Sequence, residues 1–262
     1  MSDWPRWGVM WLIAFGLFAS LKLLTILPIL KSSKPVAIWK YGAYLLAWPG
    51  MDAEAFLFRS GAVVRWWEWP FAIGKTVLGL GLTGFGIHHS SDWPPFTVGL
   101  VGMIGIPFVL HFGLFHILSC VWRTAGCDAR PIMNWPILST SLTDFWGKRW
   151  NLAFRDLTYR YLFHPCVKWF GAVGRMSFGF FASGLIHELV ITIPAGGCYG
   201  LPTLYFLIQL FGVFLERSTW AQPVRGRVFT ALFLIVPAIC LFPPLFVEGV
   251  MQPFMQFLGG AW

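Results

Sequence analysis

Long apolar runs alternate with shorter polar stretches along most of this chain. A helix needs about 20 apolar residues to cross the hydrocarbon core of a bilayer, and the runs approach or exceed that length. The pattern predicts an all-α, polytopic integral membrane protein with about six to eight transmembrane helices plus interfacial or re-entrant helices. The expected full spans are residues 8–30, 72–87, 93–122, 167–193, the part of 189–215 that follows a Pro-Ala-Gly-Gly turn, and 228–247.

Basic residues gather in segments 59–75, 123–166 and 216–227, which alternate with loops that carry few or no cations. Because cytoplasmic loops are enriched in Lys and Arg, we expect these segments on the cytoplasmic side and both termini on the other side. The first apolar run is too long for the core of a cleaved signal peptide.

Two stretches do not fit a simple series of spans. Residues 36–58 contain Asp52 and Glu54, which are costly at bilayer depth, so we predict a re-entrant or interfacial segment there. The polar segment of about 123–166 is rich in aromatic residues, which favours a position at the membrane interface. We expect one transmembrane domain over residues 1–262.

Composition narrows the functional classes. Of the 262 residues, 57% are hydrophobic and 11% are charged, whereas ordinary globular domains have about 25% charged residues. This excludes a typical cytosolic enzyme or nucleic-acid-binding domain, so the net charge of +8 is assigned to cytoplasmic loops. The five cysteines are scattered without a C-x-x-C pair and are expected to pack as apolar side chains.

An ionisable pair, His187–Glu188, falls inside an apolar span. If Arg175 lies near the cytoplasmic headgroups, the rise of 1.5 Å per residue places His187 near the middle of the bilayer. Such groups are rare in membrane spans and by default indicate a functional site that faces a cavity. The alternative is a histidine hydrogen-bonded to a neighbouring helix, with Glu188 in a structural ion pair.

The other histidines offer weaker signals. His111 and His116 have the H-x4-H spacing of membrane di-iron enzymes, but side chains five residues apart on an α-helix point about 140° apart. The chain has only six histidines and lacks an H-x-x-H-H box, so we expect no metal site. His111 remains a candidate for lining a cavity, although a packing role is the simpler interpretation. His88 and His89 are expected in an interfacial turn.

The stretch 141–151 predicts a helix capped by Ser141 or Thr143. On an α-helix Trp146 and Trp150 would share one face, with Lys148 and Arg149 beside them. Aromatic rings next to cations suit a phosphorylated ligand at the membrane surface, and Asn151 adds a neutral donor and acceptor. An aromatic-belt helix whose basic residues face lipid phosphates explains the same residues equally well.

Two motifs in this order resemble the wax synthase-like branch of the membrane-bound O-acyltransferases. They are F-W-x-x-W-N at residues 145–151 and S-G-x-x-H-E at residues 183–188. The stretch W-P-G-M-D at residues 48–52 also resembles a motif in the N-terminal half of that branch. The resemblance is closest over residues 140 to 220, approximately.

The resemblance implies transfer of an acyl group from acyl-CoA to a hydroxyl of a lipid-like alcohol, of the wax-ester type. His187 matches the family's catalytic histidine and Asn151 its asparagine. Acyl-CoA would be a co-substrate, with no further cofactor. The candidate substrate-binding residues are Trp146, Trp150, Lys148, Arg149, Glu188 and His111, with Arg155 as a further contact for the CoA phosphates.

Two other classes stay open. The chain is shorter than most acyltransferases of this class, and an aromatic-lined cavity would also suit a cyclase or isomerase of prenyl lipids, with Asp52, Glu54 or Glu188 as the proton donor. A transporter or non-catalytic lipid-binding subunit would keep the spans without the chemistry, but no internal repeat supports it. The host membrane would be a bacterial inner membrane or the endoplasmic reticulum.

Overall fold

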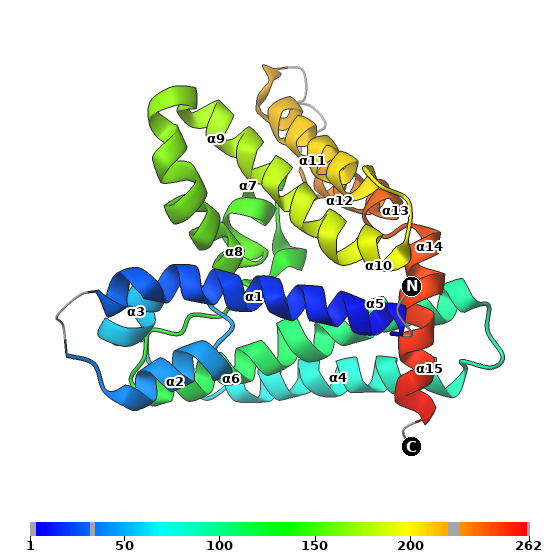
Figure 1. Ribbon diagram of the computed structural model, residues 1–262, viewed down its shortest axis with the longest axis horizontal. Helices are drawn as coiled ribbons and strands as arrows, with labels where there is room; N and C mark the ends of the chain where they lie inside the picture. Colours follow the sequence, from blue (N-terminus) through cyan, green and yellow to red (C-terminus); the bar gives the residue numbers. More distant parts are fainter. Residues whose placement is uncertain (1–3, 32–34, 220–225, 261–262) are drawn as a thin grey trace.

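The structure, a computed structural model, describes residues 4–31, 35–219 and 226–260. Within these residues every regular element is helical, as the apolar runs predict. A bilayer offers no water to the backbone, and a helix satisfies its own N–H and C=O groups. Figure 1 shows two groups of helices on either side of the long helix α1 (Arg6–Leu30), with short helices between them.

The first group is built on a hairpin. One arm is α4, and the other is an unbroken run of α5, the π-helix η1 and α6, which packs along α4. The C-terminal helices cross the α5 end of this hairpin. The elements are α4 (Glu68–His88), α5 (Pro95–Pro107), η1 (Phe108–Leu114), α6 (Phe115–Thr124), α14 (Pro244–Phe246), η7 (Val247–Met251) and α15 (Gln252–Gly260).

The second group is built on α9 and α11, which pack against each other. The Pro-Ala-Gly-Gly turn between them lies where the sequence predicts it, with Gly196 in the left-handed region at φ 74°. The elements are α9 (His164–His187), η5 (Glu188–Thr192), α10 (Ile193–Ala195), α11 (Leu201–Arg217), α12 (Arg227–Ile235) and α13 (Ala238–Leu241).

Short helices fill the two segments that were not expected to span. α2 is 10 residues long and therefore about 15 Å, half of what a bilayer core requires. This agrees with the re-entrant or interfacial placement of residues 36–58. The elements are α2 (Ile38–Ala47), α3 (Ala53–Phe58), η2 (Pro136–Leu138), α7 (Leu142–Asp144), η3 (Phe145–Arg149), α8 (Leu152–Leu157) and η4 (Thr158–Phe163).

The number of spans is lower than the six to eight predicted. In the described part of the chain, four helical stretches are long and apolar enough to cross a membrane, and a pair bent by 60° makes a fifth if it counts as one broken span. α11 has 17 residues and falls just short. The expected span 228–247 is interrupted at Pro237 and Pro243, because proline lacks an N–H and clashes with the preceding turn. The four stretches are 6–30, 68–88, 95–124 and 173–195.

The cysteines behave as the composition suggests. Cys120 and Cys127 are buried, Cys198 and Cys240 are partly buried, and all four are free thiols. The side chain of Cys166 lies outside the described residues.

Candidate active site

His187 ends α9 inside the span 173–195. It lies three residues from the middle of that span, about 4–5 Å along the helix axis. Its Nδ1 is 2.7 Å from the carbonyl oxygen of Ser183. A carbonyl only accepts hydrogen bonds, so Nδ1 must carry the proton and a neutral ring keeps its lone pair on Nε2. No described residue hydrogen-bonds to Nε2, which leaves this atom able to accept a proton.

The residues before His187 bring α9 close to α11. A Cβ at Gly184 would lie 2.8 Å from the Cα of Thr203, so any larger residue would push the two helices apart. The close approach places the Phe206 ring of α11 against the imidazole, with 4.7 Å between the ring centroids. The S-G-x-x-H part of the motif therefore has a packing explanation as well as a chemical one.

Glu188 does not pair with His187. Its two carboxylate oxygens accept from the Thr192 hydroxyl at 3.0 Å, the Gly200 N–H at 3.1 Å, and the N–H and hydroxyl of Thr203 at 3.0 and 2.9 Å. These four bonds fill the lone pairs of a carboxylate. Glu188 thus holds the turn into α11, and its predicted role in substrate binding stays a prediction. It also lines an apolar groove of about 560 Å³ with Leu185 and Tyr199.

Replacing Glu188 with alanine should destabilise this corner, because the four donors lose their acceptor. We expect a loss of about 1 kcal/mol, near the lower end of the cost of unsatisfied donors, because Gly200 is exposed and Thr203 is only partly buried. Glu188→Gln keeps one acceptor oxygen and should lose less. Thermal unfolding of the purified variants in detergent measures both, and an Ala variant as stable as wild type would contradict this role.

Trp146 lies close to His187 through a shared neighbour. Its ring packs against Phe206 and Phe180, with centroids 5.7 and 5.8 Å away. Its Nε1–H donates to Oε1 of Gln209 at 3.3 Å, which fixes the indole against α11. Trp146 and His187 thus pack on the same phenyl ring, that of Phe206, and the predicted role of Trp146 in substrate binding stays a prediction.

Trp150 does not share a face with Trp146, contrary to the α-helical interpretation. The Ser141 cap is present, since its hydroxyl accepts from the Asp144 N–H at 2.9 Å. The helix then becomes a π-turn over Phe145–Arg149, and the backbone is extended at Trp150. A π-turn has more residues per turn and changes which side chains align. Trp150 consequently stacks on Phe145 at 5.3 Å.

Aromatic rings form an unbroken series from η1 to His187. Each ring contacts the next, with centroids between 4.7 and 6.1 Å apart. The series joins η1, the segment 145–150 and α11 by apolar packing that ends at the imidazole. Its members are Phe112, Trp150, Phe145, Trp146, Phe206 and His187.

Asn151 caps α8. Its backbone is left-handed at φ 40°, a conformation that asparagine tolerates better than most residues, and its Oδ1 accepts from the Phe154 N–H at 3.2 Å. No described residue accepts a hydrogen bond from its Nδ2 group, so that amide can still donate to a ligand. Among the described contacts, Asn151 and His187 do not touch; the aromatic series lies between their segments.

The side chain of Arg149 is engaged in contacts within its own segment of the chain. Its Nε is 2.6 Å from Asp144 Oδ2, and its Nη1 donates to the carbonyl of Trp135 at 3.2 Å. Burial raises the pKa of Asp144, but the hydrogen bonds from Arg149 and from the Thr140 N–H outweigh it and hold this pKa below its ordinary value. Lys148, in contrast, is exposed.

Lys148 lines a cavity of about 320 Å³, here called the polar pocket. Its other cationic side chains are Arg59, Arg130 and Arg155, and its acids are Asp52, Asp128 and Asp156. Arg130 pairs with Asp128 and Arg155 with Asp156, whereas Lys148 and Arg59 pair with no acid in the described part of the chain. The polar pocket therefore carries two uncommitted cations.

His111 differs from the other histidines. Its Nδ1 is buried without a hydrogen-bond partner among the described residues, and its ring meets Phe115 edge-on at 5.2 Å. Its neighbour in sequence, Phe112, belongs to the aromatic series. Among the described residues, no contact joins His111 to the aromatic series or to His187, so its predicted role in lining a cavity stays a prediction.

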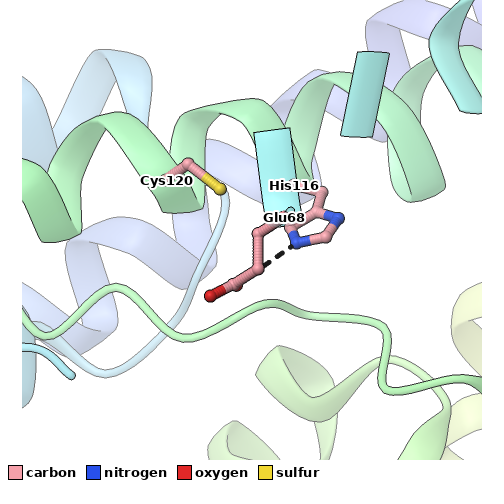
Figure 2. A group of neighbouring side chains, drawn as sticks. All are labelled: Glu68, His116 and Cys120. Atoms are coloured by element: carbon pink, nitrogen blue, oxygen red, sulfur yellow. Dashed lines mark ion pairs between the residues drawn. The ribbon is translucent and has the colours of Figure 1, made fainter. Parts of the chain in front are cut away.

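A second titratable cluster joins α4 to α6, as Figure 2 shows. Ligand atoms of Glu68, His116 and Cys120 lie within 4.8 Å of one another. Their lone pairs are already engaged: Arg123 binds both oxygens of Glu68, and Lys75 Nζ is 2.8 Å from His116 Nδ1. A metal ion would have to displace two cationic side chains, so these contacts favour a hydrogen-bonded ion network.

Sequence reasoning missed two polar residues of α11 that hold the site together. Gln209 is fully buried and donates to the Phe233 carbonyl at 2.5 Å while it accepts from Trp146. Glu216 accepts from the backbone N–H of Leu142 at 2.6 Å and so anchors the start of α7. The sequence feature that could have identified them is a polar side chain within an apolar run or at its end.

Comparison with known proteins decides the family. A model of the membrane bound O-acyl transferase family matches residues 129–208, which include Trp146, Asn151 and His187. The chain belongs to the membrane-bound O-acyltransferase superfamily. Its curated relatives place it in the wax synthase-like branch.

Three relatives from Arabidopsis thaliana illustrate the similarity. Probable long-chain-alcohol O-fatty-acyltransferase 9 is 34% identical over 70% of this chain and 58% of its own length. Probable long-chain-alcohol O-fatty-acyltransferase 8 is 30% identical over 67% of this chain and 56% of its own length. Acyl-CoA–sterol O-acyltransferase 1 is 29% identical over 61% of this chain and 51% of its own length. The chain thus spans little more than half the length of the curated relatives it matches.

Proposed function

We propose that this chain is a membrane-embedded O-acyltransferase that moves an acyl group from acyl-CoA to the hydroxyl of a long-chain lipid alcohol. The observation that carries the proposal is His187, whose Nδ1 is bound to Ser183 and whose Nε2 is free near the middle of a span. The relatives named for long-chain alcohols and a sterol indicate the acceptor class.

The reaction needs one proton acceptor and no covalent enzyme intermediate. His187 Nε2 takes the hydroxyl proton as the alcohol oxygen attacks the thioester carbonyl carbon. The carbon–sulfur bond then breaks, and the CoA thiolate takes the proton from the imidazolium. The products are one ester and one CoA thiol, and His187 returns to its neutral state.

Asn151 has the group needed to assist this step. Its unpaired Nδ2 can donate to the thioester oxygen as negative charge develops there, or orient the acceptor hydroxyl. Its cap bond to Phe154 fixes the side-chain direction in advance.

The polar pocket suits the phosphate end of acyl-CoA. Lys148 and Arg59 offer charge-assisted hydrogen bonds that no acid of the described chain occupies, and Arg155 adds a third cation. Acyl-CoA is then a co-substrate, and the reaction requires no further cofactor. The alcohol reaches the aromatic series from the surrounding lipid of a bacterial inner membrane or the endoplasmic reticulum.

The contacts do not favour a prenyl-lipid cyclase. That reaction needs an acid free to protonate its substrate, whereas Glu188 accepts four hydrogen bonds and Asp52 pairs with Arg160 while capping α3. Glu54 lies 3.9 Å from the same arginine.

A turnover assay separates these reactions. The purified chain in phospholipid vesicles is supplied with palmitoyl-CoA and 1-hexadecanol, or with a polyprenyl substrate and no acyl-CoA. We expect wax ester and free CoA in the first case and unchanged substrate in the second. Conversion of the polyprenyl substrate alone, or no ester from the first mixture, would overturn the proposal.

A further inference from the structure

Lys22 is a buried lysine in the C-terminal half of α1. Its residue is 2% exposed, and it forms no ion pair with an acid in the described part of the chain. Its Nζ donates to the carbonyl oxygen of Gly50 at 2.5 Å and lies 3.5 Å from the centroid of the Tyr44 ring. An amino group is costly to bury in either protonation state, and more so when charged. A methionine would fill this space without that cost, so the amino group needs an explanation beyond packing.

The contact leads directly to one wall of the polar pocket. Gly50 lies in the loop 48–52, and Trp48, Gly50, Met51 and Asp52 all line the polar pocket. Lys22 itself does not line the polar pocket; it contacts the lining residue Gly50 from the side that faces α1. Its bond joins α1 to a loop 28 residues further along the chain.

The loop is otherwise tightly specified. A Cβ at position 50 would lie 2.3 Å from Trp48 Nε1, so only glycine leaves room for the indole. Asp52 caps α3 through the Ala55 N–H at 2.9 Å and binds Arg160 at 2.9 Å. The fold therefore fixes the Asp52 end of the loop, and Lys22 holds the carbonyl of Gly50.

We propose that Lys22 is a positioning residue for the polar pocket: by holding the Gly50 carbonyl, it fixes the loop 48–52 as the wall against which a phosphorylated ligand binds. The identity of that ligand as the CoA end of acyl-CoA rests on the proposed function. The role of Lys22 rests on its contact with Gly50 and on the residues that line the polar pocket.

Binding of CoA to the full chain in detergent tests the proposal by calorimetry. We expect Lys22→Met to raise the Kd for CoA about tenfold, the scale of one lost hydrogen bond in a positioned site. The KM for acyl-CoA should rise by a similar factor while kcat stays within about twofold, since His187 is untouched. Lys22→Arg, which retains donors, should recover most of the affinity.

Met255→Ala is the matched control. Met255 is fully buried against Gly102 of α5, and neither residue lines the polar pocket. Loss of the Met255 side chain should therefore lower the unfolding temperature without changing the Kd for CoA. Should Lys22→Met fail to fold, Lys22→Gln, which keeps a shorter donor, is measured in its place and should show a smaller rise in Kd.

Two results would overturn the proposal: a Kd for CoA within twofold of wild type in Lys22→Met, or in Lys22→Gln where that variant replaces it, or an equal rise in Met255→Ala. The failure of the proposed function looks different. A wild-type chain that binds inorganic pyrophosphate in a Lys22-dependent manner, but not CoA, would refute acyl-CoA as the donor and leave the role of Lys22 intact.

Discussion

Replacing His187 with alanine is expected to lower kcat for acyl transfer by at least about 100-fold, the usual contribution of a positioned general base. The alcohol then loses the atom that we propose takes its proton, Nε2 of His187. The Kd for CoA should stay near the wild-type value, since the polar pocket does not include His187. Initial rates of ester formation and calorimetric binding of CoA measure the two quantities.

His88→Ala is the matched control for this experiment. His88 ends α4 at the predicted turn, where its ring meets His89 and contacts no residue of the aromatic series. We expect full activity from it. A His187→Ala protein that folds and keeps more than half of the wild-type rate would remove His187 from the mechanism.

The largest expected loss of stability comes from breaking the ion pair between Glu68 and Arg123. Their side chains are 11% and 5% exposed, and Nη2 lies 2.5 Å from Oε2. Arg123→Met leaves a buried carboxylate without its guanidinium, and we expect a loss of about 3–5 kcal/mol in the free energy of unfolding. Denaturant titration of the purified protein in mixed micelles measures it.

The double variant Glu68→Gln with Arg123→Met distinguishes a charge effect from lost packing. Removing both charges should recover most of the loss, because no ion is left buried alone. Equal stability of the single and double variants would show that the network contributes through shape rather than charge.

Much of the fold follows from local sequence. Apolar runs located the helices, the Pro-Ala-Gly-Gly stretch located the turn before α11, and Ser141 was identified as a helix cap. These features depend on residues close together in the chain. The sequence also contains the signal for the break after residue 227, because Pro237 and Pro243 both interrupt a helix there. The length of the apolar run nevertheless favoured one continuous span.

The site was only partly predictable, because its geometry depends on distant partners. Glu188 follows His187 directly, yet one residue turns an α-helix by about 100°, and the carboxylate meets Thr203 instead. The π-turn that separates Trp146 from Trp150 has no clear sequence period. Gln209 and Lys22 have partners 24 and 28 residues away, in Phe233 and Gly50, which no spacing rule connects.

Transfer of an isotope label tests the central claim most directly. The purified chain in vesicles receives palmitoyl-CoA and 1-hexadecanol labelled with ¹⁸O at its hydroxyl, and the ester is analysed by mass spectrometry. If the alcohol oxygen attacks the thioester carbonyl, the label appears in the ester as its bridging oxygen, with one CoA thiol released per ester. An ester without the label, or release of CoA without ester, would contradict the mechanism built on His187.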